Sequence, residues 1–253
     1  MVGTAALLLG LYLSVFFVPY PLFRHHAELA GFSVYSDREI PEGFGQVFAD
    51  ARHRVDQMEL YHGAPPPRIF ICRSRRLFVF LVRLAGKRHA GQGLLISAAG
   101  NAFLSADGIE SVARRNRERP AHSRLEGSWS AAVAHEVAHH LMFSELGLTR
   151  ARATPVWKSE GYADYAANAA AAGPQTDSNL RSRVRLLLDE ERWRGFSGSV
   201  DRRHFRWHVL VDYLCTIQDL DFHDLMDEAV TESEAWYWLM EWYDQSPSSP
   251  APE

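Results

Sequence analysis

The stretch Ala134-His135-Glu136-Val137-Ala138-His139-His140 places two imidazoles four residues apart, with a carboxylate beside the first. On an α-helix, four residues turn the chain by about 400°, so His135 and His139 project from nearly the same face. Two neutral imidazoles at this spacing can bind one Zn²⁺, and Glu136 lies where it can polarise a metal-bound water. Apolar residues recur around the stretch at helical spacing, and Gly147 is expected to end the helix. The sequence therefore predicts a metal-binding helix.

A second segment supplies the carboxylates that such a site needs. A catalytic zinc ion has three protein ligands and one position open to water. Glu160 follows His139 by 21 residues, which is enough to end one helix, form a loop through Pro155 and begin a second helix. Asp164 is one helical turn after Glu160, so the two carboxylates face the same way. We expect Glu160 to be the third ligand and Asp164 to accept the other ring N–H of a ligand histidine, which fixes its tautomer.

Together the two motifs resemble those of the gluzincin metallopeptidases, and especially of the bacterial peptidase MA-like group. The shared pattern is His135-Glu136-x-x-His139 followed by Trp157-x-x-Glu160-Gly161-x-Ala163-x-Tyr165. The resemblance implies a zincin-like fold in which His135, His139 and Glu160 bind Zn²⁺ and in which the glutamate of the first motif, Glu136, is the general base. The thermolysin branch also has an aspartate at the position of Asp164. The matched motifs lie between Val133 and Tyr165.

A later segment, His204–Leu214, resembles a helix of the same group that often begins with Tyr and ends with Tyr-Leu. In this register His204 takes the place of the first Tyr, and a histidine can donate a hydrogen bond to a developing oxyanion. We therefore expect His204 to stabilise the tetrahedral intermediate, with His208 and Tyr213 as alternatives. His140 is rotated by about 100° from its neighbour His139, so we expect it to pack rather than to bind the metal.

The N-terminal segment Met1–Phe23 contains no charged side chain, and its apolar centre runs from Ala5 to Val18. About 20 apolar residues span a bilayer, so with its flanks the segment suits a single transmembrane anchor. A cleaved signal peptide is the alternative, but a basic start and a small-x-small cleavage site are missing. Arg24 weakly favours a cytoplasmic domain. The resemblance instead implies a catalytic domain outside the cytoplasm, and we adopt that orientation.

Composition narrows the class of protein further. The chain has 253 residues, 47% of them hydrophobic, and can bury one sizeable core. Its formal net charge of −4, without a basic stripe interleaved with aromatics, argues against a nucleic-acid partner. Cys72 and Cys215 are expected to be small buried apolar residues, and the sequence leaves open a disulfide between them.

The remaining patterns predict an α+β fold, with a small N-terminal mixed sheet and helices followed by a mainly helical C-terminal part. Strands are expected at 32–36, 68–72, 93–97 and 101–105, a helix at 41–61, and a helix or strand at 77–84. Beyond 127 the chain is expected to be mostly helical, including 179–193, 203–218 and pieces between 222 and 243. The resemblance implies that the edge of the strand pair 93–105 adds an extended peptide as another strand, and a plain structural hairpin is the alternative. We thus expect an anchor (1–23), a zincin-like domain (24–244) and a disordered tail (245–253).

The function predicted from the sequence is zinc-dependent hydrolysis of a peptide or protein, by an enzyme held to the membrane by its N-terminal helix. The alternative is a catalytically inactive zincin-fold protein on the membrane, with a structural metal and a binding or regulatory role. Glu136 argues against the alternative, because a structural site needs no base.

Overall fold

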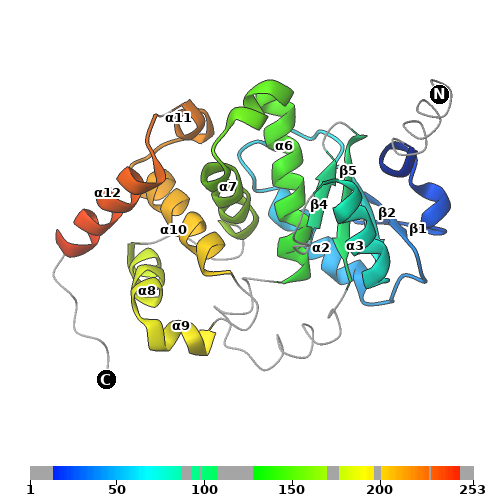
Figure 1. The fold of residues 1–253 in the computed structure, drawn as a ribbon, viewed down its shortest axis with the longest axis horizontal. Coiled ribbons are helices and arrows are strands. Elements are labelled where there is room, and N and C mark those ends of the chain that lie inside the picture. Colours follow the sequence, from blue (N-terminus) through cyan, green and yellow to red (C-terminus); the bar gives the residue numbers. More distant parts are fainter. Residues whose placement is uncertain are drawn as a thin grey trace. The chain divides into compact units, whose positions relative to one another are not determined.

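The computed structural model describes residues 14–86, 93–96, 99–106, 128–169, 177–196, 201–227 and 229–245 (Figure 1). Over these ranges the protein is α+β, with a five-stranded mixed sheet and helices, as the sequence predicts. The chain divides into two compact units. The sheet unit comprises Met1–Arg152 with Ala166–Ala171, and the helical unit comprises Ala153–Tyr165 with Ala172–Glu253.

The sheet has the strand order β1-β2-β3-β5-β4. β1 (His25–Leu29) and β2 (Phe32–Ser36) form an antiparallel hairpin, and β2 is parallel to β3 (Arg68–Cys72). β5 (Asn101–Ser105) is parallel to β3, and β4 (Gly93–Ile96) pairs with it antiparallel at the edge. The bounds predicted for β2, β3 and β5 are confirmed, as is the pairing of β4 with β5. β1 was not predicted.

Side chains alternate between the two faces of these strands, and each face has its own cover. On one face, α3 (Arg75–Leu84) and residues 15–23 pack against β3 and its neighbours in one cluster. The buried members of this cluster are Phe16, Phe23, Phe70, Cys72, Phe78, Leu81, Val82, Leu94 and Phe103. The segment at 77–84 is therefore a helix. Its N-cap is Ser74, whose hydroxyl accepts a hydrogen bond from the backbone N–H of Leu77.

The strand side chains on the other face of the sheet pack against α2 (Phe44–Val55), the helix predicted at 41–61. The ring of Phe32 in β2 lies 5.5 Å from that of Phe48 in α2. Phe44 in turn contacts Trp129, the first residue of α6 (Trp129–Ala153), at 5.3 Å. Burial of each such side chain contributes about 1.5–3 kcal/mol to folding. The helix that carries the first motif is therefore joined to the sheet through an aromatic contact.

The end of the predicted anchor belongs to the core of the sheet unit. Phe16 and Phe23 are 4% and 2% exposed, and the side-chain amide of Asn101 donates a hydrogen bond to the carbonyl of Phe16 over 2.6 Å. Residues 1–13, the rest of that prediction, lie outside the described residues. In the described part of the chain, no helix has both the length and the apolar character needed to cross a bilayer.

The helical unit is built around α10 (Arg202–Thr216), most of whose residues from Phe205 to Leu214 are buried. Around it are the first part of α7 (Val156–Ala169), α8 (Asp177–Leu188) and α9 (Glu190–Phe196), with α11 (Phe222–Asp227) and α12 (Glu232–Gln245). Gln245 closes α12, so the tail predicted from residue 245 starts one residue too early. Residues 246–253 lie outside the described residues.

The single helix predicted at 179–193 is wrong, because the chain forms two helices that meet at Asp189. The Asp189 carboxylate accepts hydrogen bonds from the backbone N–H groups of Glu191 and Arg192, at 3.1 Å and 3.0 Å. These are the contacts of a helix N-cap, so Asp189 starts α9 where the apolar pattern alone continues.

Candidate metal centre

The first motif lies on α6, whose start is capped by Ser128 and whose helical backbone is interrupted at Gly147. The Ser128 hydroxyl accepts a hydrogen bond from the backbone N–H of Ala131 at 3.1 Å, which caps the first turn. At Gly147 the backbone leaves the helical region, with φ of 71° and ψ of 164°. Glycine adopts positive φ without a steric penalty, so the predicted end of the motif helix is confirmed at this residue. Between these points the buried apolar residues are Ala131, Val133, Ala134, Val137, Ala138, Leu141 and Met142.

His135 and His139 face each other one turn apart on α6. Their Nε2 atoms are 3.1 Å apart, and their rings are nearly perpendicular, at 82°. Two nitrogens that each lie about 2.0–2.1 Å from a tetrahedral zinc ion are about 3.3 Å from one another. The observed spacing is therefore close to that of two ligands of one ion. Both side chains are half-buried, which leaves one side of the pair accessible.

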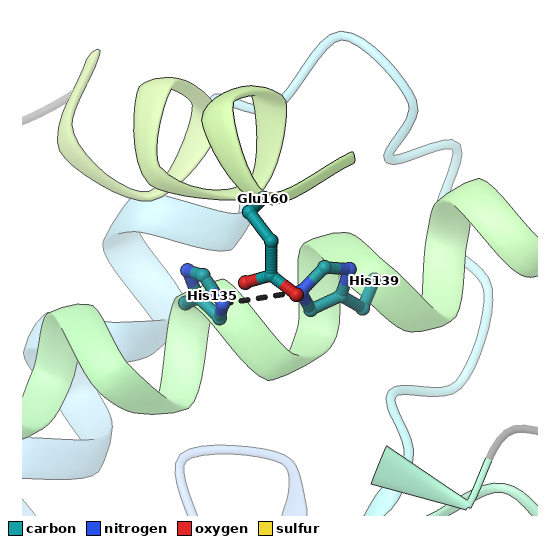
Figure 2. Close-up of side chains that lie close together, drawn as sticks. All are labelled: His135, His139 and Glu160. Carbon is teal, nitrogen blue, oxygen red and sulfur yellow. Dashed lines mark hydrogen bonds between the residues drawn. The ribbon is translucent and has the colours of Figure 1, made fainter. Parts of the chain in front are cut away.

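Glu160 of α7 extends its carboxylate toward the two imidazoles (Figure 2). One donor atom from each of the three side chains lies within 4.8 Å of the others. A bound ion would require these separations to shorten by no more than about 1.5 Å, because the edges of a tetrahedral site are near 3.3 Å. Glutamate has three rotatable side-chain bonds and can make this adjustment. Two imidazoles and one carboxylate suit zinc and also other divalent transition metals.

Glu136 is 7% exposed, although it lies beside the partly exposed His135. Its carboxylate is packed against Gly93 in the edge strand β4. A Cβ atom added to Gly93 would lie 1.9 Å from Glu136 Oε1 and 2.6 Å from its Cδ. A side chain at position 93 would therefore occupy the place of the carboxylate. This role of Gly93 was not predicted, because nothing near it in the sequence marks the contact.

Gly161, next to Glu160, allows α7 and α10 to approach closely. A Cβ atom there would lie 2.6 Å from the carbonyl oxygen of Trp207 and 2.7 Å from Cγ2 of Val211. His204 lies one turn before Trp207, and its Nδ1 is 3.9 Å from Glu160 Oε2. The His204 side chain is 44% exposed and that of Glu160 27%. The glycine of the second motif thus has a steric role, and the contact it permits lies close to the pair His204 and Glu160.

The alternatives to His204 are directed elsewhere within the helical unit. His208 is 3% exposed, and its Nε2 lies 3.0 Å from Nη1 of Arg183 in α8. Tyr213 is 2% exposed, and its hydroxyl accepts a hydrogen bond from the Gln218 amide at 2.7 Å. His204, by contrast, has its Nδ1 at 3.9 Å from Glu160 Oε2.

Four further residues singled out in the sequence have more limited outcomes. Asp164 is half-buried on α7, one turn after Glu160, and its hydrogen bond to a ligand histidine stays a prediction. His140 packs toward Gly100 in the turn before β5, and burial lowers the pKa of its imidazole. No disulfide joins Cys72 and Cys215. Cys72 lies in the sheet core, and burial raises the pKa of its thiol, whereas Cys215 is only partly buried.

A scan against models of known protein families finds none that matches this chain, and a search of curated proteins finds no similar sequence. The resemblance to gluzincins therefore rests on the sequence motifs alone.

Proposed function

We propose that the protein is a zinc-dependent metallopeptidase of the gluzincin type. The observation that carries the proposal is the convergence of His135, His139 and Glu160, whose donor atoms lie within 4.8 Å of one another. The ligands come from two helices with the spacing that the sequence motifs predict. Glu136, the neighbour of His135 in the chain, supplies a carboxylate that a purely structural metal would not need.

In the proposed mechanism, each residue has a defined task. Zn²⁺, when bound, lowers the pKa of a water ligand toward about 7 and polarises the substrate carbonyl. Glu136 takes the proton of the attacking water and later delivers a proton to the leaving amine. His204 donates a hydrogen bond to the carbonyl oxygen as it becomes negatively charged. Asp164 holds a ligand histidine in one tautomer.

An extended peptide is the substrate form that this arrangement favours. Among the described residues β4 is the edge strand of the sheet, so one side of its backbone is not paired with another of these strands. A peptide can add to such an edge through main-chain hydrogen bonds. Because Gly93 of β4 touches the Glu136 carboxylate, a peptide paired with this strand would pass close to the general base.

The proposal includes the finer expectations from the sequence. These are a zincin-like domain at 24–244, an N-terminal membrane anchor and a catalytic domain outside the cytoplasm. They also include a peptide or protein as substrate and no nucleic-acid partner. They rest on the motifs, the apolar N-terminal segment and the net charge of −4.

The test compares Glu136→Gln with Glu145→Gln, an exposed glutamate further along the same helix. We expect both variants to retain zinc. Only Glu136→Gln should lose hydrolysis of a peptide library, by about 10²–10⁴-fold in kcat, which is the usual contribution of a general base. Chelation should stop the wild-type reaction, and added Zn²⁺ should restore it. Unchanged turnover in Glu136→Gln would exclude the assigned base. A zinc-loaded wild-type protein that cleaves no peptide would favour the non-catalytic alternative.

A further inference from the structure

The helix α3 has one side in the core of the sheet unit and another that faces outward. Phe78, Leu81 and Val82 are buried in the cluster that covers the sheet. The outward side consists of two adjacent rows at helical spacing. The first row consists of Arg75, Val79 and Arg83, and the second of Arg76, Phe80 and Leu84. Together the two rows line one hollow. α3 contains no acidic residue, so this side combines three positive charges with apolar side chains.

The charged and apolar groups on this side are accessible together. Arg75, Arg76 and Arg83 are all exposed, and Phe80 is 51% exposed. An exposed phenylalanine among arginines is unfavourable in water but suits the boundary between lipid headgroups and acyl chains. Arginine at such a boundary keeps its charge at the level of the phosphates while its aliphatic stem remains in the apolar layer.

Residues 14–22 pack on the same core cluster as α3. Val15, Phe16, Tyr20 and Phe23 belong to the same core cluster as the inner side of α3, so the two segments cover the same face of the sheet (Figure 1). Their outward side chains are also apolar, with Phe17 43%, Val18 54% and Leu22 40% exposed. In the described part of the sheet unit, the exposed large hydrophobic residues are these three, Phe80 and Leu148. All but Leu148 lie on these two segments.

We propose that the outward side of α3 and residues 14–22 together form a face that rests on an anionic membrane surface. The three arginines would contact lipid phosphates, while Phe80, Phe17 and Val18 would enter the acyl boundary. Charge complementarity selects anionic lipid, and the exposed aliphatic and aromatic groups select a bilayer over a purely polar polyanion. Residues 14–22 of this face belong to the segment Met1–Phe23, which has no charged side chain. This face is independent of the proposed peptidase activity.

The test places a nitroxide label at position 80 of the full chain. Phe80→Cys is combined with Cys215→Ser, because Cys72 is buried at 0% and Cys215 is not. The control label replaces Leu148, which is 46% exposed in the same unit. In vesicles of mixed phosphatidylcholine and phosphatidylglycerol, we expect the label at 80 to become accessible to oxygen and shielded from a water-soluble nickel chelate. The label at 148 should stay accessible to the chelate.

The role of the arginines is tested by charge reversal. Because each basic residue near an anionic surface contributes about 1 kcal/mol, Arg75→Glu, Arg76→Glu and Arg83→Glu together should weaken docking of this face on mixed vesicles by on the order of 100-fold, measured as return of the label at position 80 to the nickel chelate. A matched triple reversal at Arg185, Arg192 and Arg194, all exposed in the helical unit, should have little effect. The N-terminal segment is unchanged in both variants. A label at 80 that stays in water with mixed vesicles would overturn the proposal. Equal immersion in phosphatidylcholine alone, unaffected by the arginine reversals, would overturn it too.

Discussion

Gly93→Ala should separate the chemistry of the site from metal binding. The added methyl group would lie 1.9 Å from Glu136 Oε1, whereas real Cβ contacts essentially never fall below 3.0 Å. The carboxylate must therefore move by more than 1 Å. It is the far end of a side chain, so it can rotate away while β4 and α6 stay in place. His135 and His139 do not make this contact, and we expect zinc to remain bound.

The size of the effect follows from the geometry. A displacement of about 1 Å in a catalytic group can lower the rate by about 10²-fold, or about 2.7 kcal/mol in the activation free energy. We expect kcat/KM for a fluorogenic peptide to fall by roughly that factor. The melting temperature and the zinc content should change little.

Gly43→Ala is the matched control, because a Cβ atom there has no neighbour within 4 Å and the φ of −68° suits any residue. We expect its activity to equal that of the wild type. Its stability should be equal or slightly higher, since removing a glycine reduces the entropy of the unfolded chain by about 0.4–1 kcal/mol. If Gly93→Ala keeps full kcat/KM, the position of Glu136 against β4 has no part in catalysis, and the reasoning fails.

Three further predictions concern the helical unit. Gly161→Ala should lower the free energy of unfolding, measured by urea titration, by about 1–3 kcal/mol. The reason is that the new Cβ atom meets the backbone carbonyl of Trp207, which cannot move away as the end of a side chain can. An unchanged transition midpoint would refute this. His204→Phe should reduce kcat by roughly 10²-fold with unchanged zinc content, and an unaltered kcat would remove His204 from the mechanism. Thr231 and Glu234 bond reciprocally at the start of α12, and these hydrogen bonds lower the pKa of the Glu234 carboxyl. Because the pKa of Glu234 is lower in the folded than in the unfolded state, the charged carboxylate stabilises the fold above the unfolded-state pKa. This stability is lost as the pH falls through the folded-state pKa, so Glu234→Gln should flatten the acid side of a plot of unfolding free energy against pH. An unaltered plot would count against the pairing of Thr231 with Glu234.

Much of the fold could be predicted because its elements carry a local pattern. β2 and β3 alternate or run continuously apolar between turn residues, and their bounds were predicted correctly. β1 was missed because its residues His25, His26 and Glu28 are exposed and polar, as an edge strand allows. The break at Asp189 was missed because α8 and α9 continue one apolar pattern, and only the side-chain contacts of the cap reveal it.

The candidate site was predictable where its residues share a helix. The spacing of His135 and His139 fixes their common face, and the second motif gives Glu160 its register on α7. Gly93 was not predictable, since its contact with Glu136 joins segments far apart in the chain. The sequence predicts His204 with His208 as an alternative, but the contact of His208 with Arg183 of α8 depends on packing and was not predictable.

Metal stoichiometry tests the central claim most directly. The full chain, equilibrated with Zn²⁺ and then freed of unbound ion, should contain one zinc ion per molecule by elemental analysis. His139→Ala and Glu160→Ala should each lose most of that metal, while Glu136→Gln should keep it. Zinc content that is absent in the wild type, or unaffected when His139 and Glu160 are replaced, would contradict the proposed metal centre.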